Sequence, residues 1–339
     1  MKHLLITHFG IALLSFTLPA HAQKADSSAF FKGKTISVYI GGTPGASYDT
    51  QGRLLARHMG RYITGTPNFV VQNLIGAGGI RMVNFLHTQA PKDGAQLGMI
   101  PNTLPALQAV GGRGVQFDLG QFRWIGSITP VSLTMTAWRG RGITSLQDAK
   151  TREVVAAASA KGAITYTVPA LTNAILGTKF KIVTGYQGLA DISLALERGE
   201  AEAVMSSIEN WKVTKPDWWN DKKVLMFIQA EPKSSDIPDV PSIQELAGND
   251  EDRRLANFVL AGSKLGFPMA AGPGGPPEST RILRAAFMSA MRDPAFKAEA
   301  AKMLLDVNPV SGEELTAIVT DVLTAPKSLV DRARKIISE

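Results

Sequence analysis

Short runs rich in β-branched and aromatic residues alternate along the chain with longer stretches in which apolar residues recur at helical spacing. In the N-terminal part, strands are predicted at 35–40, 69–71 and 96–100. Helices with one apolar face are predicted between them, at 47–62 and 80–87. This order of strand, loop, helix and strand is typical of a parallel sheet with crossover helices.

The same alternation continues towards the C-terminus. A Pro-rich segment at 231–241 and a Gly/Pro-rich segment at 272–277 precede a helical C-terminal end. Further strands are predicted at 131–138, 153–158, 181–184, 203–205 and 224–229, and further helices at 145–150, 165–176, 191–198 and 278–292.

The order and number of these elements predict an α/β protein with two lobes. A chain that leaves one α/β lobe, builds a second and returns to the first shows this order. The roughly 317 residues after position 22 also exceed the size at which a single core stops growing. We predict a first lobe from 23–130 and 246–339, and a second lobe from 131–245.

Residues 1–22 have the pattern of a cleavable signal peptide. Lys2 is the only charged residue of this segment, and an apolar stretch at 4–18 follows it. Pro19 ends the stretch, and Ala20-His21-Ala22 supplies the small-x-small pattern that a signal peptidase reads. A membrane anchor needs roughly 20 apolar residues, more than this stretch contains. We therefore expect an exported protein.

The composition narrows the possible functions. The chain contains no cysteine, which excludes a lipid-modified cysteine, disulfides and thiolate metal sites. Without Lys2, 35 of the 36 basic residues remain against 29 acidic ones, a net charge of +6. The densest basic groups, Arg139-Gly140-Arg141 and Arg253-Arg254, lack aromatic neighbours placed for base stacking. We therefore expect no nucleic-acid partner, whereas an anionic small molecule suits the mild positive excess.

Three partial catalytic motifs are incomplete. A P-loop ending has Ser28 where the first glycine is required, and a dinucleotide fingerprint has Arg81 at its third glycine. A nucleophile elbow has Asp49 in place of its last glycine. His58 and His87, the histidines after the signal peptide, both have apolar helical neighbours. We expect no metal site, and the sequence offers few of the catalytic residues that a serine or zinc hydrolase requires.

Two glycine-rich loops give the clearest functional signal. The loops at 41–46 and 76–79 each follow a predicted strand and open a predicted helix. Glycine allows the backbone to approach a ligand, and the following helix N-terminus offers unpaired N–H groups and the positive end of a dipole. An alternative interpretation is that these glycines only allow tight turns between strand and helix. Two such loops in consecutive units nevertheless predict an anion site at this edge of the sheet.

The residues around these loops resemble the Bug-type solute receptors, the periplasmic binding proteins of tripartite tricarboxylate transporters. The resemblance is carried by Val38–Asp49 (VYIGGTPGASYD), Arg53–Ala56 (RLLA), Val70–Gly79 (VVQNLIGAGG) and Pro91–Gly94 (PKDG). It continues more weakly through 186–188, 199–203, 238–245 and 272–277, and spans nearly the whole chain after residue 22.

The resemblance implies a two-lobed Venus-flytrap protein, with a mostly parallel sheet flanked by helices in each lobe. Such a protein closes on a small carboxylate, which two loops hold through backbone N–H groups and water. It implies a free periplasmic monomer without a cofactor that delivers its ligand to a membrane transporter or a sensor. Carried over, the ligand-binding positions are Gly45, Ala46, Ser47 and Asp49 in the first loop, Ala77, Gly78 and Gly79 in the second, and Ser159, Lys161, Gly162, Thr165, Tyr186, Gln187, Gly188, Ser206 and Ser207 in the second lobe.

This chain departs from the family pattern at several of these positions. Ala46 stands where glycine is usual, and Leu74-Ile75 replaces Arg-Pro. Lys92 is inserted in the P-D-G turn. Ala163 replaces a common hydroxyl residue, and nearby Lys161 supplies either a charge to the ligand or a solvated surface group. These changes bear on the identity of the ligand and leave the expected fold unchanged.

Three functions remain open from the sequence. The first is a non-enzymatic receptor for a small organic carboxylate. The second is a periplasmic enzyme acting on a small acid through Ser47 or Ser159. The third is a ligand-independent partner-binding protein with a degenerate cleft. Asp49 is expected to cap its helix or to order water, since an ionised acid would repel the ligand.

Overall fold

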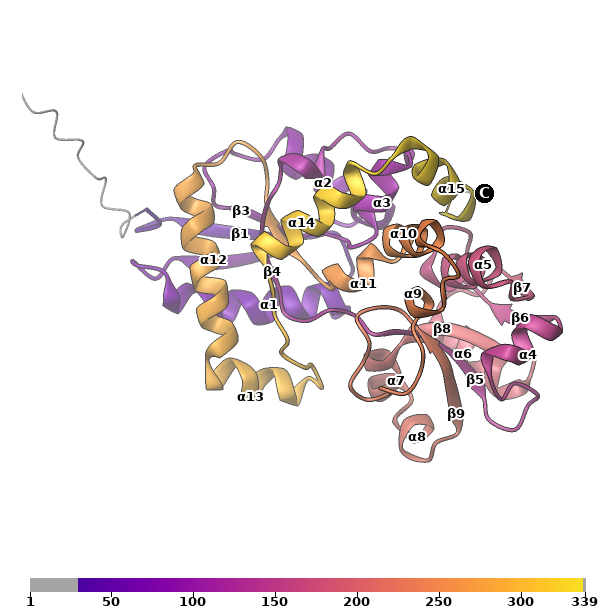
Figure 1. Ribbon diagram of the computed structural model, residues 1–339. Coiled ribbons are helices and arrows are strands. Elements are labelled where there is room, and N and C mark those ends of the chain that lie inside the picture. Colours follow the sequence, from indigo (N-terminus) through magenta and orange to yellow (C-terminus); the bar gives the residue numbers. More distant parts are fainter. Residues whose placement is uncertain (1–29, 338–339) are drawn as a thin grey trace, which may run out of the picture.

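Two β-sheets divide the chain into two lobes (Figure 1). The computed structural model describes residues 30–337, and the predicted signal peptide, residues 1–22, lies outside them. The strands are β1 (Thr35–Ile40), β2 (Asn68–Asn73), β3 (Gln96–Met99), β4 (Arg123–Ser127), β5 (Leu133–Trp138), β6 (Val154–Ala157), β7 (Phe180–Val183), β8 (Ala203–Ser207), β9 (Val224–Gln229), β10 (Met269–Ala271) and β11 (Val310–Ser311). The first lobe contains the sheet β11-β4-β10-β3-β1-β2, and the second contains β7-β6-β8-β5-β9.

Most strands of each sheet share one direction. In the first sheet β1 pairs parallel with β2 and β3, and β10 pairs antiparallel with both β3 and β4, so β1 to β4 run the same way. β11 also runs against β4. In the second sheet β6 to β9 share one direction, and β5 runs opposite to them between β8 and β9. The predicted α/β fold with two mostly parallel sheets is confirmed.

Helices cover both faces of the first sheet. Ile36, Val38 and Ile40 of β1 point into one hydrophobic cluster, whereas Tyr39 packs against another, as the two-residue period of a strand requires. The first cluster includes side chains of α1 (Ser47–Met59), α12 (Pro277–Arg292) and α13 (Pro294–Lys302). The second cluster includes side chains of α2 (Ile80–Thr88), α3 (Leu104–Ala109) and α14 (Gly312–Leu323).

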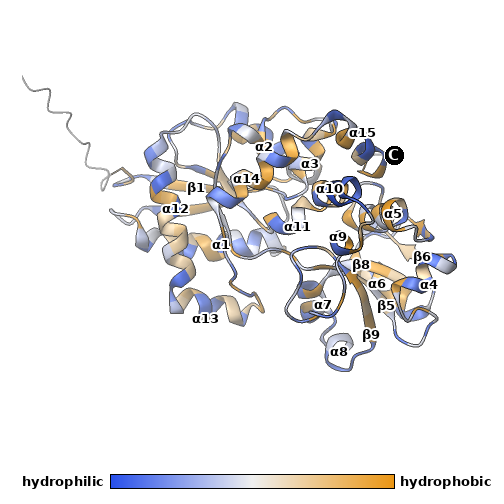
Figure 2. Ribbon diagram, in the orientation of Figure 1, coloured by the Kyte–Doolittle hydropathy of each residue, from blue (hydrophilic) through white to orange (hydrophobic). Residues whose placement is uncertain are grey.

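The second sheet is covered by another set of helices. These are α4 (Leu146–Thr151), α5 (Ile164–Leu176), α6 (Leu189–Arg198), α7 (Ile208–Thr214) and α8 (Pro216–Asn220). In Figure 2 β5, β8 and β9 are coloured towards orange, the hydrophobic end of the scale. Met205 of β8 is fully buried, which fits this position at the centre of the sheet.

The chain crosses between the lobes more than once. It enters the second lobe through 128–132 and returns through α9 (Ile243–Leu246), α10 (Asp250–Val259) and α11 (Ala261–Leu265). The last helix, α15 (Lys327–Ile337), packs against α10 and α5 (Figure 1). Its Ile336 is buried in the same hydrophobic cluster as Met205 of the second sheet. The division into 23–130 with 246–339 and 131–245 stays a prediction.

No helix within residues 30–337 is long and apolar enough to span a membrane.

Candidate functional site: a cavity between the lobes

A cavity of about 310 Å³ lies between the two lobes. Larger hollows of about 630 and 600 Å³ lie elsewhere, but the N-termini of α1, α5 and α6 do not line them. The wall of the cavity takes residues from both lobes and from the segments that join them. These residues are Ser47, Tyr48, Asn102, Thr103, Ala106, Val131, Leu133, Gly162, Ile164, Thr165, Thr167, Leu189, Met205, Ser206, Ser207, Asn210, Val259, Leu260, Gly262, Ser263, Phe267 and Ile337.

Three helices begin at this cavity without a side-chain cap. α1 from the first lobe is preceded by Ala46, and α5 from the second by Ala163, so neither N-cap residue has a capping oxygen. α6 is preceded by Gly188 and is also uncapped by any side chain. The first residues of these helices line the wall. Their N–H groups lack intrahelical partners, and each helix dipole places partial positive charge there. This arrangement can bind an anion without a cationic side chain.

Asp49 holds the first glycine loop in shape from behind the cavity wall. Its Oδ2 accepts hydrogen bonds from the Gly45 N–H and Arg53 Nε, both at 2.9 Å. Its Oδ1 accepts one from Asn73 Nδ2 at 2.9 Å, and the same amide donates to the Gly42 carbonyl at 3.0 Å. The Arg53 hydrogen bond is the main cause that lowers the pKa of Asp49 to about 2. The buried carboxylate therefore orders the loop and does not line the cavity.

The second glycine loop packs against the first. A Cβ atom on Gly41 would lie 2.6 Å from the Cα of Gly79, so only glycine allows this approach. Gly79 has a φ of +93°, and its own Cβ would lie 2.4 Å from Pro101 Cγ. Ala77, with a φ of +47°, and Gly78 are exposed, and neither lines the cavity. In this structure the second loop supports the first rather than forming the wall.

The structure brings some of the predicted site residues together and leaves others apart. Ser47, Gly162, Thr165, Ser206 and Ser207 line one cavity, although they come from opposite lobes. The other predicted positions lie outside its wall: Gly45, Ala46, Asp49, Ala77, Gly78, Gly79, Ser159, Lys161, Tyr186, Gln187 and Gly188.

Some of these outer residues hold wall residues in place. The Ser159 N–H donates to Thr165 Oγ1 at 3.1 Å. The Gln187 N–H donates to the Asp191 carboxylate at 3.2 Å, at the start of α6. Ser159 therefore holds the wall residue Thr165, and Gln187 fixes the start of α6, whose first residue Leu189 lines the wall.

Asn210 and Asn102 position the polar part of the wall. Asn210 donates from Nδ2 to Ser206 Oγ and from its N–H to Ser207 Oγ, both at 3.1 Å. The Asn102 N–H donates to Tyr48 Oη at 2.8 Å, and burial raises the pKa of this phenol. The Asn102 side chain also donates to the carbonyl of Gly262 at 3.0 Å. The Asn102 bonds join α1, the segment after β3 and α11, and the Asn210 bonds join α7 to the end of β8.

Sequence reasoning misses much of the wall. Asn102 and Thr103 follow the third predicted strand, so the rule that ligands bind beyond strand carboxyl ends could have found them. Val259 and Ser263 return from the second crossing between the lobes, and Ile337 ends α15. No local motif marks these three, because only long-range packing brings them to the cavity.

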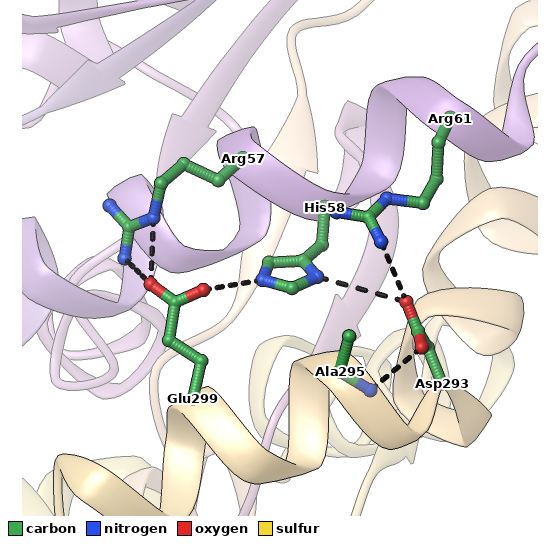
Figure 3. Close-up of polar contacts among 6 residues, drawn as sticks. All are labelled: Arg57, His58, Arg61, Asp293, Ala295 and Glu299. Atoms are coloured by element: carbon green, nitrogen blue, oxygen red, sulfur yellow. Dashed lines mark hydrogen bonds and ion pairs between the residues drawn. The ribbon is translucent and has the colours of Figure 1, made fainter.

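The two histidines lie away from the cavity. His58 is buried near the C-terminal end of α1, where its Nε2 lies 2.6 Å from Glu299 Oε2 of α13 and its Nδ1 lies 3.8 Å from Asp293 Oδ2 (Figure 3). The hydrogen bond from His58 is the main cause that lowers the pKa of Glu299. His87 stacks against Phe122 in the first lobe. Within residues 30–337, no group of three or more acidic or histidine side chains is placed to hold a metal ion.

No protein-family model matches the sequence, and no curated protein matches it. Solved structures do resemble it. A TctC solute-binding protein from Polaromonas has a TM-score of 0.68 at 17% identity, over 88% of this chain and 98% of that one. MatC from Rhodopseudomonas palustris with bound malate has a TM-score of 0.61 at 19% identity, over 87% and 98%. The periplasmic binding protein BugD has a TM-score of 0.60 at 17% identity, over 89% and 97%.

This likeness extends over both lobes of all three proteins. At these identities it establishes the fold, which is the two-lobed fold of TctC-type and Bug-type periplasmic solute-binding proteins. The fold implied by the glycine-loop segments is therefore confirmed.

Proposed function

We propose that this protein is a periplasmic solute-binding protein, not an enzyme, which captures a small organic carboxylate between its lobes. It then delivers the ligand to a membrane transporter or a sensor. The observation that carries the proposal is that α1 from one lobe and α5 and α6 from the other all begin, without side-chain caps, at one cavity. A carboxylate there would receive hydrogen bonds from both lobes.

Contacts from both lobes explain how such a protein would signal that it is loaded. The closed arrangement gains the hydrogen bonds of both sets of N–H groups, whereas an open one gains those of a single lobe. A ligand can shift the equilibrium only by its difference in affinity for the two states. Ser47 on one side and Thr165 with Ser206 on the other supply that difference.

Other features support this location and ligand class. MatC is a protein of the same fold that binds malate, a small carboxylate. The signal-peptide pattern at 1–22 fits a periplasmic site of action. We propose a monomer, with lobes divided near residues 130 and 245. A direct contact between ligand and the second glycine loop, Ala77 to Gly79, remains part of the proposal.

A thermal-unfolding screen tests the proposed function. The chain without residues 1–22 is heated with mono-, di- and tricarboxylates, aromatic acids and amino acids. A ligand at 100 times its Kd should stabilise the protein by ~2.7 kcal/mol. If no acid in this panel raises the unfolding temperature, the proposal is wrong.

A further inference from the structure

β2 is an open edge of the first sheet. It pairs with β1 on one side, and no strand of residues 30–337 pairs with its other side. Just after β2, the Leu74 N–H donates to the Ile40 carbonyl of β1 at 2.8 Å. Backbone groups on one side of a strand recur at every second residue. The N–H and C=O groups of Phe69 and Val71 therefore point away from β1, towards the open side.

The sequence of β2 lacks the features that usually keep such an edge from pairing. Asn68–Asn73 (NFVVQN) contains no charged residue and no proline. Its six residues pair with β1 in one uninterrupted register, so no bulge turns the edge away. Natural proteins protect exposed edges with charged side chains, proline or bulges. An unprotected edge of this length can accept a further strand through backbone hydrogen bonds.

A row of arginines runs beside this edge. Arg53, Arg57 and Arg61 follow one another at every fourth residue of α1 and of the short 3-10 turn that continues it, so they share one face. They line the hollow of about 600 Å³ together with Phe69 and Val71, the residues whose backbone groups point outward. None of the described residues that line this hollow is acidic. The hollow is therefore a cationic surface next to an open strand.

The acidic partners of these arginines are less exposed than the arginines themselves. The side chain of Arg53 is 41% exposed, whereas that of its partner Asp49 is 4% exposed. The side chain of Arg61 is 46% exposed, and that of its partner Asp293 is 11% exposed (Figure 3). Arg57 is likewise more exposed than the carboxylate with which it pairs. The surface beside β2 thus presents guanidinium groups, with most of the carboxylate surface behind them.

We propose that the β2 edge is a docking site for an extended segment of a partner protein in which every second residue is acidic. Four residues of a helix advance by about 6 Å, and two residues of a strand by about 6.7 Å. A strand added to β2 would therefore bring every second side chain opposite successive arginines. Carboxylates at those positions would accept charge-assisted hydrogen bonds from the guanidinium groups. None of the arginines lines the interlobe cavity, and the proposal does not depend on what the cavity binds.

A second copy of this chain fits the edge less well. An antiparallel pair of two β2 strands would place both α1 helices on the same face of the joined sheet. The two arginine rows would then face each other across the pair, and like charges repel. An acidic segment has the complementary charge.

Two peptides with blocked ends test the proposal. In one, glutamate and threonine alternate over eight residues, and in the other the same residues are grouped, with all glutamates in one half. Binding to the chain without residues 1–22 is measured by calorimetry at pH 7 and low salt. The alternating peptide should bind at least about tenfold more tightly, and added salt should weaken it. Equal affinities, or no binding of the alternating peptide, would overturn the proposal.

Variants of the edge test the two parts of the surface separately. The double variant Arg57→Gln, Arg61→Gln should weaken the alternating peptide at least about tenfold. Arg198→Gln is the matched control, an exposed ion-paired arginine at the end of α6. Val71→Pro removes an outward N–H and leaves the bonds to β1, so it should also weaken the peptide at least about tenfold. Undiminished binding in a folded form of either edge variant would contradict the proposal.

Two other occupants of the edge can be distinguished from an acidic segment. Sedimentation of the chain alone tests a second copy, and a dimer that Val71→Pro dissociates would overturn the proposal. Vesicles of phosphatidylglycerol and phosphatidylcholine test a lipid surface. Tighter binding to these vesicles than to the alternating peptide, lost in the double arginine variant, would assign the arginines to a membrane and overturn the proposal as well.

Discussion

Gly41 and Gly79, from two different loops, meet so closely that a Cβ atom on Gly41 would lie 2.6 Å from the Cα of Gly79. The contact joins the loop before α1 to the loop before α2. The position of the α1 N-terminus at the cavity therefore depends on a backbone contact that any side chain would disturb.

Gly41→Ala should destabilise the protein and weaken ligand binding. The added methyl would meet backbone, which cannot rotate away, and overpacking of this kind costs about 1–3 kcal/mol. Gly42→Ala is the matched control, since its Cβ would meet nothing within 4 Å. Urea unfolding and calorimetry measure both effects. Equal stability and equal ligand affinity of the two variants would show that the loops do not need this contact.

Asp49→Asn should lower stability at neutral pH and less so in acid. The pKa of Asp49 in the folded protein is about 2, below the ordinary pKa of an aspartate. The ionised carboxylate therefore stabilises the fold at pH values above that ordinary pKa. This contribution, about 2 kcal/mol, is lost as the pH falls through the folded pKa. The difference in unfolding free energy between wild type and variant, measured by urea unfolding, should become smaller from pH 7 to pH 2. The exposed Asp306→Asn is the control, and a gap independent of pH would contradict the assignment.

Gly78→Val tests whether the second loop touches the ligand. If it does, the added side chain should abolish binding while unfolding remains cooperative. Gly111→Val is the control for backbone strain without ligand contact, because Gly78 and Gly111 both have positive φ and open space around the Cβ position. Binding that survives in Gly78→Val, or falls equally in both variants, would limit the second loop to a supporting role.

His58→Ala should affect stability but not ligand affinity. It removes a buried side chain that joins α1 to Glu299 of α13, which typically costs a few kcal/mol, about 2–4. Arg57→Gln breaks a half-exposed ion pair with the same carboxylate and should cost less than about 1 kcal/mol. Urea unfolding and ligand titration measure both variants. A large loss of affinity in His58→Ala would mean that the far end of α1 communicates with the cavity.

Local patterns in the sequence predict the elements that have strong local signals. β1 is a continuous β-rich run, and α1 shows a clear apolar face, so both are found where the pattern places them. β10, Met269–Ala271, is three residues long with no β-branched residue, and pairing with β3 and β4 alone makes it a strand. β4 is likewise fixed by its neighbours in the sheet.

The same distinction applies to the site. Ser47 and Thr165 lie at helix starts that the sequence marks, and both line the cavity. Leu133 and Met205 look like ordinary core residues of strands, and their exposure to the cavity follows from how the lobes meet. The polar half of the wall was therefore more accessible to prediction than the apolar half.

Binding of one acid and of its carboxamide is the most direct measurement of the central claim. The acid that stabilises the protein most is compared with its amide by calorimetry at pH 7, since the two have nearly the same shape and differ in charge. If uncapped helix N-termini hold the ligand as an anion, the acid should bind at least about 100-fold more tightly. An amide that binds as tightly as the acid would contradict the account.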